Sequence, residues 1–250
     1  MNISNNTILI TGGATGIGFA LAESLIEAGN TIIICGRRED RLKEAKARLP
    51  AIHTRVCDVS KETERKALFS WVKSEFPKLN ILVNNAGVQK MVDLTKGTAD
   101  LKGRENEIST NLEAPIYLAA HFIPLLTLRP RAAIINVSSG LGFIPIAAMP
   151  VYCATKAAIH SFTISLRYQL KDTSIKVFEI LPPMVDTELG GSTMQQMPEG
   201  ERGIKPAELA KEVMQSLLMD KYEIPVRESK ALVNATKKEL ERLFQNMNRW

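Results

Sequence analysis

The chain reads Thr11-Gly12-Gly13-Ala14-Thr15-Gly16-Ile17-Gly18 between a short apolar run, residues 7–11, and a longer amphipathic segment. Gly12 permits a tight turn after a strand, Gly16 lets the backbone approach a pyrophosphate, and Gly18 lets a helix pack against the sheet. The free N–H groups at the start of that helix attract anions. The stretch predicts a strand–turn–helix unit that binds a dinucleotide, whereas the alternative is a turn with no ligand.

Similar short β-branched runs recur along the chain, each followed by a turn and an amphipathic stretch. They cover residues 7–11, 31–35, 52–57, 81–84, 132–138 and 175–181, and a seventh strand is expected near 222–226. Nearly continuous apolar runs are typical of parallel strands covered by helices on both faces. The pattern predicts an α/β fold with a doubly wound parallel sheet in a single domain, residues 1–250, and an exposed helix after Asn234.

Composition excludes several classes of protein. The 250 residues are 45% hydrophobic and 24% charged, which is ordinary for a globular domain, and the net charge of +5 is too small to indicate a nucleic-acid partner. The apolar stretch 114–128 is interrupted by prolines and is too short to span a membrane, and no export signal is visible. The cysteines, Cys35, Cys57 and Cys153, have no metal or disulfide spacing, and the three histidines form no metal or triad pattern. We therefore expect a soluble cytoplasmic protein without a metal.

The end of the second predicted strand indicates which dinucleotide binds. It closes with Cys35-Gly36-Arg37-Arg38, where NAD sites carry a carboxylate for the ribose 2′-hydroxyl. Two guanidinium groups there suit the 2′-phosphate of NADP, and the alternative is a pair of solvated arginines. We predict NADP as the cofactor.

A candidate for proton chemistry lies in the segment 151–171, whose pattern is helical. Tyr152 and Lys156 are four residues apart and share a helix face, and a nearby ammonium is expected to lower the pKa of the phenol. Ser139 ends the fifth predicted strand, thirteen residues before Tyr152, where its hydroxyl can hold a carbonyl oxygen. Tyr-x-x-x-Lys alone is a weak signal, because such pairs are common on solvated helices.

Taken together, these residues resemble the short-chain dehydrogenase/reductase family, whose fold is Rossmann-like. The motifs that match in order over residues 7 to about 220 are Thr11–Gly18, Asp58, Asn84-Asn85-Ala86-Gly87, Ser139 and Tyr152-x-x-x-Lys156. The resemblance implies hydride transfer between NADP(H) and a carbonyl or alcohol. It also implies that Tyr152 is the acid or base, that Lys156 holds the nicotinamide ribose, that Ser139 orients the substrate and that Asn111 supports a proton relay. Cofactor contacts are implied for Gly12, Thr15, Gly16, Ile17, Gly18, Arg37, Arg38, Asp58, Val59, Asn85, Ala86, Gly87, Tyr152, Lys156, Val185 and Thr187.

The region after the sixth predicted strand departs from the family pattern. It reads Pro182-Pro183-Met184-Val185-Asp186-Thr187, so Pro183 replaces the usual glycine and removes an N–H donor. This string is also similar to that of a bacterial subgroup associated with D-alanylation of teichoic acids. The glycine-containing segment that follows, about residues 186–205, is expected to be a substrate lid.

Three functions stay open at this point. The leading prediction is an enzyme acting on a small carbonyl or alcohol substrate, with specificity set near Gln89, Leu141, Phe143 and Met184. A protein that binds NADP as a sensor or interaction module without turnover is the alternative, supported by Pro183, and an isomerase or dehydratase using Asp186 or Glu188 ranks last. The resemblance further implies a homodimer or homotetramer, in which the helices near residues 104–128 and 151–171 pack across a two-fold axis.

Overall fold

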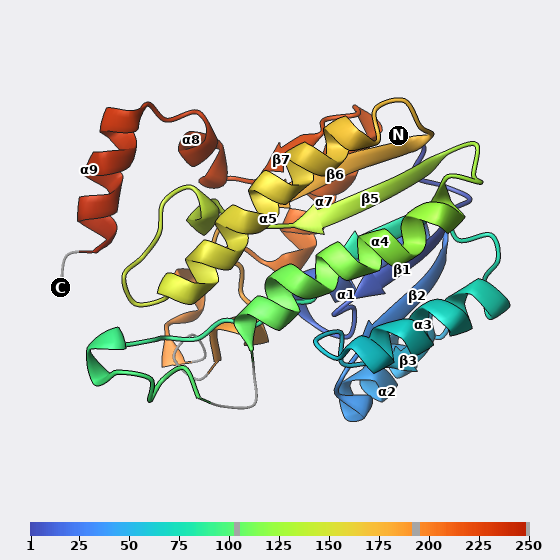
Figure 1. Ribbon diagram of the computed structural model, residues 1–250, viewed down its shortest axis with the longest axis horizontal. Coiled ribbons are helices and arrows are strands. Elements are labelled where there is room, and N and C mark those ends of the chain that lie inside the picture. Colours follow the sequence, from blue (N-terminus) through green and yellow to red (C-terminus); the bar gives the residue numbers. More distant parts are fainter. Residues whose placement is uncertain (103–105, 192–195, 249–250) are drawn as a thin grey trace.

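The computed structural model describes residues 1–102, 106–191 and 196–248, and its centre is a parallel β-sheet (Figure 1). The described strands occur in the order β3-β2-β1-β4-β5-β6-β7. Their bounds are β1 Thr7–Thr11, β2 Thr31–Gly36, β3 His53–Val56, β4 Ile81–Asn84, β5 Ala132–Val137, β6 Ile175–Leu181 and β7 Glu223–Pro225. Every neighbouring pair is parallel, so the predicted doubly wound α/β fold is confirmed.

Helices cover both faces of this sheet (Figure 1). Their bounds are α1 Gly16–Glu27, α2 Glu39–Arg48, α3 Glu62–Glu75, α4 Ala114–Leu126, α5 Pro150–Gln169, α7 Pro206–Leu218, α8 Ser229–Val233 and α9 Lys237–Met247. One buried apolar cluster joins α1, α2 and α7 to the sheet, and a second joins α3, α4 and α5 to its other face. Because both faces are buried, the strands need the continuous apolar runs seen in the sequence.

The order of the strands places a ligand site. The chain leaves β1 toward β2 on one side and returns to β4 on the other, so the connections diverge between β1 and β4. In an open parallel sheet, a crevice forms at this point outside the carboxyl ends of the strands. The glycine-rich turn after β1 and the segment after β4 meet there.

Two expected helices differ from their predicted bounds. Of the helix expected near 104–128, Arg104 lies outside the described residues, and the run begins as a π-helical turn, Ser109–Glu113, that leads into α4. The expected C-terminal helix is α9, which starts with a capping box between Thr236 and Glu239.

The predicted lid, residues 186–205, includes 192–195, which lie outside the described residues. Short 3₁₀ turns occur at Glu188–Gly190 and Glu199–Glu201. Both ends of the segment are joined, because Val185 pairs with Ile204 in a parallel bridge. Gly203, with φ of +91°, passes so close that a Cβ there would lie 2.2 Å from the Met184 carbonyl oxygen. The base of the segment is therefore fixed against the end of β6.

Within the described parts of the chain, no helix is long and apolar enough to cross a bilayer. Further 3₁₀ turns lie at Leu94–Lys96 and Gly140–Gly142. The second of these turns follows β5 directly and shapes the site.

Candidate active site

The glycine-rich turn forms a cradle that side chains would fill. Gly12 and Gly16 adopt φ of +63° and +57°, and a Cβ on Gly12 would lie 2.8 Å from the Ala86 Cα. A Cβ on Gly18 would lie 2.5 Å from both the Gly12 carbonyl oxygen and Asn85 Nδ2. The Asn85 amide donates to the Thr11 and Gly12 carbonyl oxygens at 2.9 and 3.1 Å, which joins β4 to the turn. The glycines therefore let the turn pack tightly against the segment after β4, and Gly12 and Gly16 line the cleft at the start of α1, where a phosphate is expected.

The two arginines after β2 lie at one end of the same cleft. Arg38 forms an ion pair with Glu188 at the base of the predicted lid, with 2.7 Å between Nη1 and Oε2. Glu188 also pairs with Arg41 at 2.9 Å. The pairing, which spans 150 residues of sequence, was not predicted, since only the fold brings Glu188 back to α2. Arg38 therefore connects the expected 2′-phosphate site to the lid.

The third motif residue, Asp58, lies beside these arginines. Its carboxylate accepts hydrogen bonds from the Ser60 backbone N–H and hydroxyl at 3.1 and 2.7 Å, while Val59 is buried. Asp58 and Val59 thus form a rigid wall of the cleft after β3.

A continuous cleft of about 1320 Å³ connects these groups with the predicted catalytic residues. Its volume exceeds that of a typical single-ligand pocket, so it has room for a dinucleotide and a second molecule. Of the predicted residues, it is lined by Gly12, Thr15, Gly16, Ile17, Arg37, Arg38, Asp58, Val59, Asn85, Ala86, Gly87, Ser139, Tyr152, Lys156, Val185 and Thr187. Gly18 and Asn111 lie behind its wall instead, where they pack against backbone.

Apolar side chains line the remainder of the cleft. They include Met91, Leu141, Ile146, Met149, Met184, Leu189, Met197, Leu232 and Met247. Of the side chains expected to set specificity, Gln89, Leu141 and Met184 line the cleft, whereas Phe143 packs against His160 with ring centroids 4.5 Å apart. A smaller hollow of about 330 Å³, beside Thr7 and Asn80 at the other end of the strands, contains none of the motif residues.

Ser139, Tyr152 and Lys156 line the cleft beside β5, three strands across the sheet from the β2 end that carries the arginines. Ser139 follows β5, and its Oγ accepts a hydrogen bond from the Leu141 N–H at 3.1 Å. Lys156 Nζ donates to the Val137 carbonyl oxygen at 2.9 Å and lies 5.6 Å from the centroid of the Tyr152 ring. Tyr152 and Lys156 are only 5% and 4% exposed, so water screens their charges poorly.

Burial controls the acidity of both groups. It raises the pKa of the Tyr152 phenol well above its usual value, although a hydrogen bond with Ser139 acts in the opposite direction. In the protein alone, the cost of desolvating a phenolate therefore outweighs any lowering of the Tyr152 pKa by Lys156, and the effect expected of Lys156 stays a prediction. Burial also lowers the pKa of Lys156 from 10.5 to about 8, and Glu179 opposes this shift.

Asn111 occupies the π-helical turn before α4 rather than a regular helix. Its Oδ1 accepts from the Val88 N–H at 2.8 Å, and its Nδ2 donates to the Val88 carbonyl oxygen and to Thr155 Oγ1. A Cβ on Gly87 would lie 3.5 Å from Asn111 Oδ1 and 3.8 Å from Lys156 Nζ. The Asn111 and Lys156 side chains thus both border Gly87, and the relay expected of Asn111 stays a prediction.

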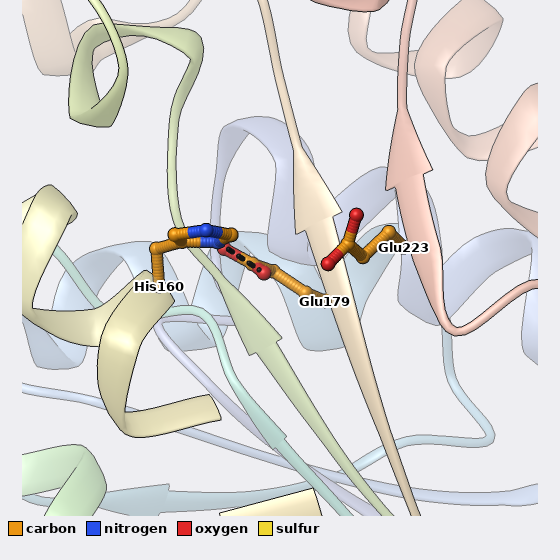
Figure 2. A group of neighbouring side chains, drawn as sticks. All are labelled: His160, Glu179 and Glu223. Carbon is orange, nitrogen blue, oxygen red and sulfur yellow. Dashed lines mark hydrogen bonds and ion pairs between the residues drawn. The ribbon is translucent and has the colours of Figure 1, made fainter. Parts of the chain in front are cut away.

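A further group of titratable side chains was missed by the sequence analysis. The group consists of His160 on α5, Glu179 on β6 and Glu223 on β7. One side-chain nitrogen or oxygen atom of each, of the kind that can bind a metal ion, lies within 4.8 Å of the other two (Figure 2). His160 Nδ1 and Glu179 Oε2 are 2.9 Å apart. The spacing of these residues along the chain does not predict the group, because only the tertiary fold brings them together.

Comparisons with known proteins agree with this geometry. The family model for short chain dehydrogenase matches residues 6–198. Over 248 residues the chain is 50% identical to "Uncharacterized oxidoreductase DltE" of Bacillus subtilis (strain 168), covering 99% of this chain and 98% of that one. An uncharacterized oxidoreductase of Staphylococcus saprophyticus is 32% identical over 77% of this chain and 84% of its own length.

Solved structures of short-chain dehydrogenases have a similar fold. A short-chain dehydrogenase from Sphingobium yanoikuyae in complex with NADPH has a TM-score of 0.81 and 27% identity, and each chain is covered to 96%. A Burkholderia cenocepacia short chain dehydrogenase in complex with NADP has a TM-score of 0.83 at 23% identity, covering 98% of this chain and 99% of that one. The chain therefore belongs to the short-chain dehydrogenase/reductase family of oxidoreductases.

Proposed function

We propose that the protein is an NADPH-dependent carbonyl reductase, or the reverse alcohol dehydrogenase, that uses Ser139, Tyr152 and Lys156. The observation that carries this proposal is that these three side chains line, beside β5, the same cleft that the glycine-rich turn and the two arginines line after β1 and β2. One domain would then hold both the cofactor and the substrate.

NADPH is proposed over NADH because of the charges after β2. Arg37 and Arg38 line the cleft, and the strand ends without the carboxylate that would bind a ribose 2′-hydroxyl. Guanidinium groups bind phosphate through charge-assisted hydrogen bonds. The relative solved with NADPH, at 27% identity, supports the same choice.

The proposed reaction uses two groups of this chain on the substrate oxygen. Bound NADPH would supply a hydride to the carbonyl carbon. Tyr152 donates its phenolic proton to the carbonyl oxygen, while the Ser139 hydroxyl orients and polarises that oxygen. Because burial raises the pKa of Tyr152, the phenol is protonated at neutral pH and ready to act as an acid. This state suits reduction.

Lys156 and Asn111 support that proton transfer. The Lys156 ammonium would hold the nicotinamide ribose and stabilise the phenolate left after the transfer. Asn111, placed by its π-helical turn, would extend the path of the proton beyond Lys156. Val185 and Thr187 would contact the nicotinamide, and Pro183 reduces the number of backbone donors there.

The apolar cleft supports an apolar substrate of small or medium size. Its methionine side chains are flexible and polarisable, and such side chains adapt to several ligand shapes. The segment 186–205, joined at its base by the Val185–Ile204 bridge, would close over that substrate.

NADPH oxidation by the purified protein tests this function. The loss of NADPH absorbance is followed with aldehydes, ketones, quinones and keto-acyl thioesters, and NADPH binding is followed in parallel by fluorescence. We expect binding together with turnover of at least one carbonyl class. Binding without turnover of any of them would favour the sensor function instead.

A further inference from the structure

A row of polar side chains crosses the sheet behind the catalytic residues. Asn84, Asn136, Glu179 and Glu223 are register partners on β4, β5, β6 and β7. Neighbours in register on parallel strands point to the same face of the sheet, here the face covered by α5. The polar row, as we call these four residues, interrupts strands that are otherwise apolar apart from Lys176 on β6.

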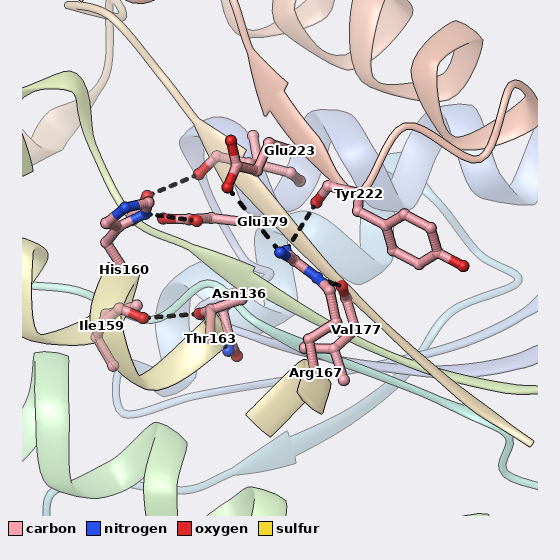
Figure 3. A network of polar contacts seen from close by, with 11 residues as sticks. Asn136, Ile159, His160, Thr163, Arg167, Val177, Glu179, Tyr222 and Glu223 are labelled. Atoms are coloured by element: carbon pink, nitrogen blue, oxygen red, sulfur yellow. Dashed lines mark hydrogen bonds and ion pairs between the residues drawn. The ribbon is translucent and has the colours of Figure 1, made fainter. Parts of the chain in front are cut away.

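Helix α5 carries a matching stripe of side chains (Figure 3). Asn84 donates to Asn136, which donates to Thr163 Oγ1, each at 2.9 Å. His160 Nδ1 meets Glu179 Oε2 at 2.9 Å, and Arg167 Nη1 lies 3.9 Å from Glu223.

This stripe continues directly from the catalytic pair. Tyr152, Lys156 and His160 follow one another at intervals of four residues and therefore lie along one side of α5. Lys156 Nζ is bonded to the Val137 carbonyl oxygen on β5, and Val137 pairs with Ile180, the residue after Glu179. The catalytic lysine and the polar row thus share one buried layer between α5 and the sheet.

Glu179 is the member of the row with the greatest electrostatic consequence. Its side chain is fully buried, and a buried carboxylate is strongly destabilised unless positive charge or hydrogen bonds compensate it. Burial raises the pKa of Glu179 above its usual value and the Glu223 carboxylate adds to this rise, whereas Ser138 and His160 act in the opposite direction and favour the ionised form. Arg167 on α5 faces Glu223 and offsets part of that repulsion. His160, whose side chain is 23% exposed, gives the pair access to solvent protons.

Lys156 is a buried cation, and burial destabilises its charged form as it does that of Glu179. It is 4% exposed and must carry a positive charge to hold a ribose and stabilise a phenolate. Burial lowers its pKa to about 8 even with the opposing effect of Glu179, so loss of that carboxylate would leave more of Lys156 neutral near neutral pH. The Glu179 carboxylate acts on it in the opposite direction.

We propose that Glu179, held ionised by His160, is a positioning residue that keeps Lys156 in its ammonium form. Glu179 acts through Lys156 and does not itself contact the substrate. The role of this charge in catalysis rests on the proposed function, but the protonation of Lys156 can be measured without turnover.

Two readouts in the full-length protein test this proposal. The first is the titration of Lys156 by carbon-13 NMR of lysine-labelled protein, with the signal assigned by its absence in Lys156→Met. The second is the pH profile of kcat for carbonyl reduction. Glu179→Gln keeps the shape of the side chain and removes its charge, and Glu223→Gln is the matched control, because it removes a neighbouring carboxylate of the same row.

We expect Glu179→Gln to weaken proton binding by Lys156 on the order of tenfold, the size of one pKa unit. The alkaline limb of kcat should then move to lower pH, while kcat at acidic pH stays unchanged. Glu223→Gln should leave both readouts close to wild type. If Glu179→Gln does not fold, His160→Gln takes its place, with the same expected direction.

An unchanged Lys156 titration in the folded Glu179→Gln variant would overturn the proposal. The same holds if Glu223→Gln moves that titration as far as Glu179→Gln does. Absence of turnover by the wild-type protein would instead count against the proposed function and would leave the NMR result to decide on Glu179.

Discussion

Replacing Arg38 by alanine removes the guanidinium that we assign to the cofactor's 2′-phosphate. Charge-assisted hydrogen bonds contribute about 1.5–3 kcal/mol. In the protein alone, however, Arg38 forms an ion pair with Glu188. This partly exposed pair contributes about 0–1 kcal/mol, and that contribution is lost when Arg38 binds a phosphate instead. The net loss in Arg38→Ala is therefore about 0.5–3 kcal/mol, or roughly 2- to 160-fold weaker NADPH binding.

The assay is fluorescence titration of NADPH and NADH with wild type and variant at one fixed ionic strength. NADH has no 2′-phosphate, so its Kd should change by less than about twofold. Glu188→Gln is the companion variant and should strengthen NADPH binding by up to about fivefold, because it removes the competitor for Arg38. Equal loss of NADPH and NADH affinity in Arg38→Ala would refute the assignment of Arg38 to the 2′-phosphate.

Two further predictions follow from burial and from the C-terminal helix. Since the pKa of Lys156 is lowered from 10.5 in the unfolded chain to about 8, the native state binds fewer protons than the unfolded state between these values, and stability rises with pH there. Lys156→Met should remove this slope. In urea unfolding, the variant should be more stable than wild type by up to about 3 kcal/mol at pH 7, and this difference should shrink toward pH 10. A stability difference that does not change with pH would contradict the prediction. Asn248 bonds to the Ala147 N–H and, at 3.2 Å, to the Pro145 carbonyl oxygen, which holds the cleft-lining Ile146 in place. Asn248→Ala should raise KM for the carbonyl about fivefold and leave the Kd of NADPH unchanged, and a change in NADPH binding alone would exclude this role.

Local chemistry explains why most of the fold was predictable. The glycines of the first turn require positive φ or close backbone approach, and those requirements are visible in the residues themselves. The apolar runs of β1, β4 and β6 match the structure at both ends, because parallel strands buried on two faces need them. The π-helical turn at Asn111 could not be predicted from the sequence, since the Asn111 side chain forms its hydrogen bonds with Val88 and Thr155 rather than with sequence neighbours.

The electrostatics of the site were much less predictable. The four-residue spacing of Tyr152 and Lys156 placed them on one face of α5, but their burial depends on how β5 and the Gly140–Gly142 turn pack against that helix. Burial reversed the expected direction for the pKa of Tyr152. The pairs Arg38–Glu188 and His160–Glu179 join distant segments of the chain, so only the folded structure shows them.

The proposed function depends most on Tyr152 as the proton donor. The decisive measurement compares Tyr152→Phe with wild type in two assays, NADPH oxidation with the best carbonyl substrate and NADPH binding by fluorescence. We expect kcat to fall at least about 10²-fold, the contribution of a positioned general acid, while the Kd of NADPH stays within about twofold. Turnover of Tyr152→Phe at a rate near that of wild type would contradict it.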